Sequence, residues 1–192
     1  MNCLVTTIGT TWSIIPEVLG FTNPELLDLY RHCGQSAHYA RLRQSYNIQP
    51  VDCIHIVTTL NQKLVAPALA KLRRWFEPFA AGLELYIYQR EGVVDLTSAG
   101  ECRQMTDLIW RTVLHARQQC GPDGQLLLCL AGGRKTMSAD VQEAAHIFGC
   151  HAMLHVVDAD QERASHLNKF EEGITLLQGP LPPEYAEATV PI

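Results

Sequence analysis

The sequence has little of what marks membrane proteins or proteins that bind duplex nucleic acid. No apolar run approaches the roughly 20 residues that a membrane-spanning helix requires, so we expect no membrane segment. Basic residues are outnumbered, because 15 Lys and Arg stand against 20 Asp and Glu and the net charge is −5. An acidic total argues against binding to duplex DNA, although it permits a small anionic ligand in a local basic pocket.

The sequence also lacks internal repeats, low-complexity tracts and a disorder-prone composition. Hydrophobic residues make up 47% of the 192 residues and charged residues 18%, which is typical of a globular α/β protein. Residues 1–160 are expected to form one domain with its own core. Residues 161–192, which are more polar and contain several prolines, are expected to be a C-terminal extension that packs on this domain or on a dimer partner.

The seven cysteines include no CxxC pair, and no secretory signal precedes them. We therefore expect a reduced chain in the cytoplasm. Cys129 and Cys150 lack a visible base, so neither is expected to be a nucleophile. His151 and His155 would lie roughly 13 Å apart along a strand, too far to share an ion. The sequence thus predicts no metal site and no cofactor.

Apolar, β-branched runs alternate with amphipathic segments along the chain. Such alternation predicts an α/β fold, a Rossmann-like open parallel sheet with helices on both faces. The apolar run at 174–177 is a candidate for one more strand, and a second helical segment is expected to start at Asn23 and to continue through Tyr30. The expected strands span 3–8, 51–59, 83–88, 125–130 and 151–157, and the other helices lie near 14–19, 39–43, 64–76, 98–119 and 136–148.

The stretch from Leu126 to Ser138 organises the rest of the chain. It predicts a buried strand that runs into Gly132 and Gly133, then two cations, then the start of a helix. Glycines let backbone N–H groups approach an anion closely, and the helix dipole favours negative charge there. A tight turn with two solvated basic residues is the alternative.

Three other polar loops are expected at the same edge of the sheet. They span residues 9–13, 58–61 and 89–92, and each follows an expected strand. In open parallel sheets, ligands bind beyond the carboxyl ends of the strands. The shared edge therefore favours a phosphate-type ligand over an isolated turn.

Two common phosphate motifs are absent. A P-loop reads GxxxxGK followed by Ser or Thr, but here Arg134 separates Gly133 from Lys135, and Leu128 occupies the position of the first glycine. The dinucleotide fingerprint GxGxxG would follow the first strand, where the chain offers only Gly9. Nucleoside triphosphates and NAD are therefore poor candidates.

The run from Leu130 to Ser138 closely resembles the signature loop of CRISPR-associated Rossmann-fold (CARF) domains. The segment from Thr6 to Glu17 resembles the first-strand loop of the same family. The similarity covers roughly residues 1–160, and its Gly-Gly-Arg-Lys-Thr-Met portion is fairly specific. The resemblance implies a homodimer that places these loops around a cyclic oligoadenylate, the second messenger of type III CRISPR defence.

A cyclic oligoadenylate suits the residues of these loops. Glycines, cations and a helix start can hold its phosphates, Thr hydroxyls can bond ribose or phosphate, and Trp12 can stack on a base. The expected ligand-binding residues are Gly9, Thr10, Thr11, Trp12, Ser13, Thr58, Thr59, Asn61, Gly132, Gly133, Arg134, Lys135, Thr136 and Met137.

About 30 residues follow the last expected strand, too few for the effector domain that many CARF proteins carry. Two alternatives remain open. One is a metal-independent ring nuclease in which a ribose 2′-hydroxyl attacks its own phosphodiester, with Lys135 or Arg134 stabilising the phosphate charge and Thr10 or Thr11 orienting the nucleophile. The other is a non-catalytic sensor that acts through a partner protein.

Overall fold

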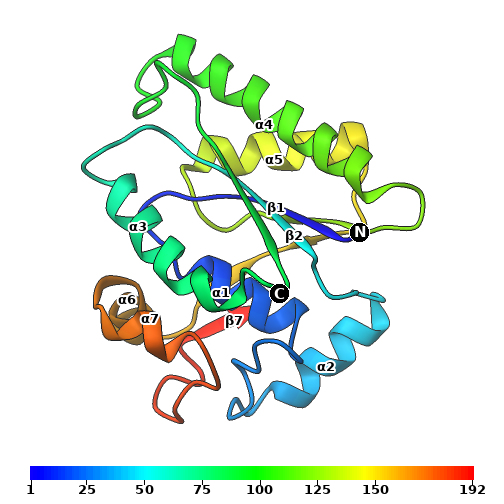
Figure 1. Cartoon of the computed structure of the whole chain (residues 1–192), viewed down its shortest axis with the longest axis vertical. Helices are drawn as coiled ribbons and strands as arrows, with labels where there is room; N and C mark the ends of the chain where they lie inside the picture. The colour runs from blue at the N-terminus through cyan, green and yellow to red at the C-terminus, as the bar shows by residue number, and fades with distance from the viewer.

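The computed structural model describes residues 1–192 and has a five-stranded parallel sheet at its centre (Figure 1). The strand order β3-β2-β1-β4-β5 places the first strand in the middle. This arrangement confirms the predicted Rossmann-like class. The strands are β1 (Cys3–Thr7), β2 (Cys53–Val57), β3 (Glu84–Tyr88), β4 (Leu126–Cys129) and β5 (Ala152–Leu154).

Helices cover both faces of the sheet, as Figure 1 shows. Helices α1 (Ile14–Thr22) and α3 (Val65–Phe76) bury apolar side chains with one face, and α4 (Ala99–Cys120) and α5 (Lys135–Phe148) with the other. Every residue of β1, β2 and β4 is buried, which explains their continuous apolar runs. Helix α2 (Ser36–Ser45) and a short 3₁₀ helix (Glu77–Phe79) complete this part. None of the helices combines the length and the apolar character needed to cross a bilayer.

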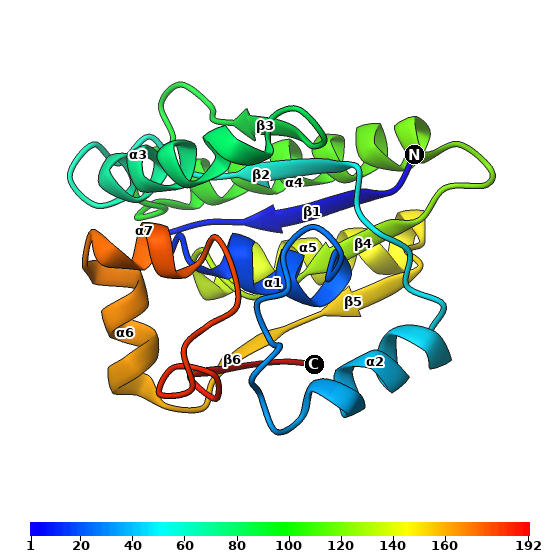
Figure 2. The ribbon, with the colours of Figure 1, turned by 60° about the horizontal axis from the view of Figure 1, so that its bottom comes forward.

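The C-terminal segment adds two helices and a two-stranded ribbon. Helices α6 (Gln161–Lys169) and α7 (Glu172–Leu176) lie at the end of the molecule toward which β1 runs (Figure 2). Strand β7 (Thr189–Pro191) pairs antiparallel with β6 (Val156–Asp158). Leu167, Ile174 and Leu177 join the larger apolar core, so this segment is packed against the sheet domain.

Three sequence predictions of secondary structure are wrong. The expected strand at 151–157 is divided, because β5 ends at Leu154 and β6 turns away to pair with β7. The candidate strand at 174–177 falls mostly within helix α7, whose Ile174 is buried, as is Leu177 just after it. The expected helix from Asn23 to Tyr30 is a series of turns. This segment packs tightly on α1, since a Cβ on Gly20 would lie 2.5 Å from the Cβ of Leu29.

Candidate functional site

The loops after β1 and β4 meet because these two strands are neighbours in the sheet. Thr6 pairs with Cys129 at the last step of their register, and Thr7 then donates a hydrogen bond to the carbonyl oxygen of Gly132 at 3.1 Å. A Cβ on Gly9 would lie only 3.5 Å from the Cα of Gly133. Gly132 and Gly133 have φ of +93° and +66°, a region that glycine adopts most easily. The backbone therefore carries both loops to one place.

Two adjoining hollows flank this meeting point and share Gly9, Thr10 and Gly133. The larger hollow, of about 450 Å³, lies on the β5–β6 side. The smaller one, of about 260 Å³, lies on the β2–α3 side. The predicted residues in the larger hollow are Gly9, Thr10, Thr11, Gly132, Gly133 and Lys135. Those in the smaller hollow are Gly9, Thr10, Thr59, Asn61, Gly133, Arg134 and Met137.

Helix α5 begins at this edge with free hydrogen-bond donors. The backbone N–H groups of Gly133, Arg134, Lys135 and Thr136 donate to no acceptor in the chain. Lys135 and Thr136 are exposed, and no hydrogen bond or ion pair engages the Lys135 ammonium. Ser138 fixes the turn by donating to the carbonyl oxygen of Leu130 at 2.9 Å. Free N–H groups, a helix dipole and one unpaired cation together favour an anion at this point.

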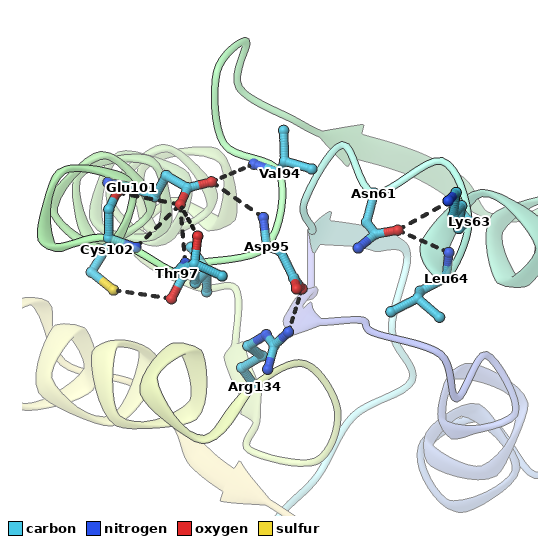
Figure 3. Close-up of polar contacts among 11 residues, drawn as sticks. Asn61, Lys63, Leu64, Val94, Asp95, Thr97, Glu101, Cys102 and Arg134 are labelled. Carbon is cyan, nitrogen blue, oxygen red and sulfur yellow. Dashed lines mark hydrogen bonds and ion pairs between the residues drawn. The ribbon is translucent and has the colours of Figure 1, made fainter.

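Arg134 is engaged within the chain: it forms an ion pair with Asp95 (Figure 3). Asp95 lies in the segment between β3 and α4, which Glu101 organises by accepting backbone hydrogen bonds from Val94 at 2.9 Å and Asp95 at 3.2 Å. These bonds lower the pKa of Glu101 to about 2. An anionic ligand would therefore compete with the Asp95 carboxylate for Arg134. The Lys135 ammonium has no partner in the chain, so it can bind the ligand directly.

The prediction that Trp12 stacks on a base is corrected by its burial. Its side chain is 1% exposed, and its Nε1–H donates to the carbonyl oxygen of Asn168 at 2.8 Å. The Asn168 side chain also accepts from the backbone N–H of Trp12 at 2.9 Å and donates to the carbonyl oxygen of Thr10 at 3.3 Å. Trp12 therefore anchors the first loop to α6 and offers no face to a ligand.

Several other predicted side chains are used inside the fold. Ser13 and Thr58 are buried, and the Thr58 hydroxyl donates to the carbonyl oxygen of Ile8 at 2.7 Å. Met137 lines the smaller hollow although only 1% of it is exposed. The Asn61 side chain accepts from the backbone N–H groups of Lys63 and Leu64 at the start of α3 (Figure 3). These residues shape the loops, and Thr136 lines neither hollow.

Residues that the sequence analysis did not select also line the site. His155 and Asp158 face the larger hollow from the β5–β6 segment, and Asp95 lines the smaller one. Asn168 holds the first loop from a distance of 156 positions along the chain. No local pattern marks Asp95 or Asn168, because each acts through a contact that only the tertiary fold creates.

Glu17, in the helix that follows the first loop, is 1% exposed, and its Oε1 has no hydrogen-bond partner. Burial raises the pKa of Glu17 from 4.5 to about 8, although a hydrogen bond from Ser13 partly opposes this rise. The folded chain therefore holds a proton that the unfolded chain releases near pH 4.5. The contribution of this protonated Glu17 to the free energy of unfolding is full below pH 4.5 and is lost as the pH rises toward 8.

Glu17→Gln should remove this pH dependence, because glutamine keeps the shape and cannot ionise. The variant is expected to exceed the wild type in free energy of unfolding at pH 8.5, by at most about 5 kcal/mol, with a much smaller difference at pH 5. Urea unfolding at both pH values measures this. Glu143→Gln, at an exposed position of α5, is the control. Parallel pH profiles for wild type and Glu17→Gln would contradict the assignment.

The model of a family described as CRISPR-associated protein NE0113 matches residues 39–188. No curated protein sequence matches the chain. Among solved structures, Csm6 of Enterococcus italicus bound to cyclic hexa-2′-fluoro-hexa-dAMP is similar over 100% of this chain, with a TM-score of 0.51 and 14% identity. The chain spans 41% of that protein's length, and a likeness at this identity concerns the fold.

Proposed function

Because the chain belongs to the family of CRISPR-associated protein NE0113 and has the CARF fold, we propose that its two glycine loops, residues 9–11 and 132–135, bind a cyclic oligoadenylate. One observation carries this proposal: the loops 9–11 and 132–135 meet at a hollow of about 450 Å³ that is lined by Lys135 and bordered by unpaired backbone N–H groups. Csm6, which shares the fold, was solved with a cyclic hexanucleotide analogue bound. That ligand contains phosphodiester groups, and their negative charge suits the cation and the N–H donors of this hollow.

Each phosphodiester of such a ring brings one negative charge. The N–H groups of Gly133 to Thr136 would donate to its oxygens, and the Lys135 ammonium would add a charge-assisted bond. The hydroxyls of Thr10 and Thr11, at the wall of the same hollow, would bond ribose or phosphate oxygens. A two-fold symmetric ring matches a two-fold symmetric dimer, so the binding species in this proposal is a homodimer that places two such sites side by side.

The same arrangement would support metal-independent cleavage of the ring. A ribose 2′-oxygen would attack its own phosphorus, the bond from phosphorus to the 5′-oxygen would break, and the 2′ proton would end on the departing 5′-oxygen. Lys135 or Arg134 would stabilise charge on the phosphate, and Thr10 or Thr11 would orient the nucleophile. The products are a linear oligoadenylate with a 2′,3′-cyclic phosphate at one end and a 5′-hydroxyl at the other.

A sensor without catalysis is the second candidate, and the Arg134–Asp95 pair favours it. A ligand that drew Arg134 away would release Asp95, which belongs to the segment that Glu101 ties to the start of α4. Ligand binding would then change the surface around α4 with no bond broken. Such a change is what a chain that signals through a partner needs.

Incubation with cyclic tri-, tetra- and hexa-adenylate, followed by chromatography, tests the proposal. Linear products formed in the presence of EDTA would establish the ring nuclease. An intact ring together with a ligand-dependent rise in melting temperature would establish the sensor. If no ring of any size is cleaved or raises the melting temperature, the proposed function is wrong.

Lys135→Ala is expected to weaken ring binding by about 10- to 100-fold, because a hydrogen bond to a charged group contributes roughly 1.5–3 kcal/mol. The melting temperature of the ligand-free protein should stay close to that of the wild type, since the Lys135 side chain is exposed and unpaired. Lys169→Ala, which removes the same charge from the exposed end of α6, is the matched control. Equal affinity in the two variants would remove Lys135 from the site.

A further inference from the structure

A second group of polar side chains lies at the opposite end of the sheet. Cys3 and Cys53 begin strands β1 and β2 and stand directly opposite each other in the register. His55 follows two positions later on the same strand, and all three side chains are fully buried. Their sulfur atoms and a ring nitrogen of His55 lie within 4.8 Å of one another. The two glycine loops follow the opposite ends of β1 and of its neighbour β4, so the group is separate from the hollows.

The donor set of this group has the chemistry of a zinc site. Two thiols and an imidazole are ligands that Zn²⁺ prefers, whereas Mg²⁺ and Ca²⁺ require oxygen. In a tetrahedral site with Zn–S bonds of about 2.3 Å, the ligand atoms stand roughly 3.5–4 Å apart. The Cys53 sulfur lies 3.2 Å from Nε2 of His55. Small shifts of side chains would therefore produce the required geometry.

We propose that Cys3, Cys53 and His55, with Cys120 as the fourth ligand, bind one Zn²⁺ ion that ties β1, β2 and α4 together. Cys120 is the last residue of α4, the helix that covers this face of the sheet, and its thiol donates to the carbonyl oxygen of Gln125 at 3.1 Å. The same carbonyl oxygen accepts the backbone N–H of Cys3 at 2.8 Å, so Cys120 lies beside the group. To complete the site, the Cys120 thiol would turn from the Gln125 carbonyl oxygen toward the three sheet residues. The negative end of the α4 dipole also favours a cation there.

His55 is already oriented for this role. Its Nδ1 lies 3.0 Å from the hydroxyl of Tyr88, and its ring stacks against Tyr86 with centroids 5.4 Å apart. A histidine that binds a metal through one nitrogen commonly donates its other N–H to a neighbouring group. A bond from Nδ1–H to Tyr88 would leave the Nε2 lone pair facing the thiols.

Four protein ligands and full burial indicate a structural rather than a catalytic ion. A catalytic zinc keeps an open position for water, whereas Cys3, Cys53 and His55 are 0% exposed and Cys120 is 4% exposed. The ion would enter as the chain folds, so its binding free energy would add to that of folding. This role is independent of any ligand at the glycine loops.

Metal analysis of the purified, untagged chain tests the inference. Protein expressed with added zinc should contain about one zinc ion per chain, Cys53→Ser should lose it, and Cys150→Ser, outside the group, should keep it. Because Cys53→Ser can unfold, a second measurement uses the wild type: Co²⁺ added to the metal-free chain should give thiolate-to-cobalt charge-transfer absorption. A chain that lacks zinc and gives no such absorption would show that these are packed, hydrogen-bonded thiols and would overturn the proposal.

Discussion

Gly132→Ala is expected to lower the free energy of unfolding by roughly 2–4 kcal/mol and to weaken ring binding at the same time. Two effects add at this position. Its φ of +93° disfavours any residue with a Cβ. That Cβ would also lie 2.4 Å from the carbonyl oxygen of Thr7 and 3.2 Å from Cδ1 of Ile14. The loop would have to move away from β1, and the donors at the start of α5 would move with it.

Gly149→Ala is the matched control for this prediction. Gly149 has a φ of +74° and ends α5 at the other side of the molecule, but a Cβ there would meet no atom within 4 Å. Only the conformational cost of about 1 kcal/mol should remain, with ligand affinity unchanged. Urea unfolding and ligand titration of both variants measure the difference. Equal losses of stability would mean that the contact with Thr7 is unimportant.

Trp12→Ala is expected to destabilise the fold by about 3–5 kcal/mol, the usual cost of truncating a large buried aromatic side chain. Trp12 is among the largest fully buried side chains, and its truncation would also remove the shorter of the two hydrogen bonds to the carbonyl oxygen of Asn168, leaving only the Lys71 ammonium at 3.3 Å. Thermal or urea unfolding measures the loss. This loss of stability would come from lost packing between the first loop and α6, and it would not depend on the ligand.

Trp12→Phe separates this role from base stacking. Phenylalanine fills most of the volume but cannot donate to Asn168, so a smaller loss of about 1–3 kcal/mol is expected. At a temperature where the variant is folded, its affinity for the ring should match that of the wild type. Normal stability with a large loss of affinity would restore Trp12 to the ligand site.

The sheet could be predicted from the sequence because its inner strands are buried on both faces. Continuous apolar runs such as Leu126–Cys129 have few alternatives, and the helices between them imply parallel strands. The predictions failed where tertiary contacts decide the local structure. Leu27 and Leu29 are buried in the larger core without a helix, and β6 exists because β7, some thirty positions later, pairs with it.

Part of the candidate site was predictable because its position follows from the parallel sheet. The rule that ligands bind at the carboxyl ends of parallel strands brought Gly9 and Gly133 together without knowledge of any contact. It could not show that Asp95 holds Arg134 or that Asn168 holds Trp12. Both are pairings between distant segments, and a polar residue in a loop gives no sign of its partner.

Calorimetric titration of the purified chain with cyclic tri-, tetra- and hexa-adenylate tests the central claim most directly, with Lys135→Ala titrated in parallel. We expect saturable binding of at least one of these rings, at about one ring for every two chains, and an affinity about 10- to 100-fold weaker in the variant. Absence of binding to all three rings, or identical isotherms for the wild type and Lys135→Ala, would contradict it.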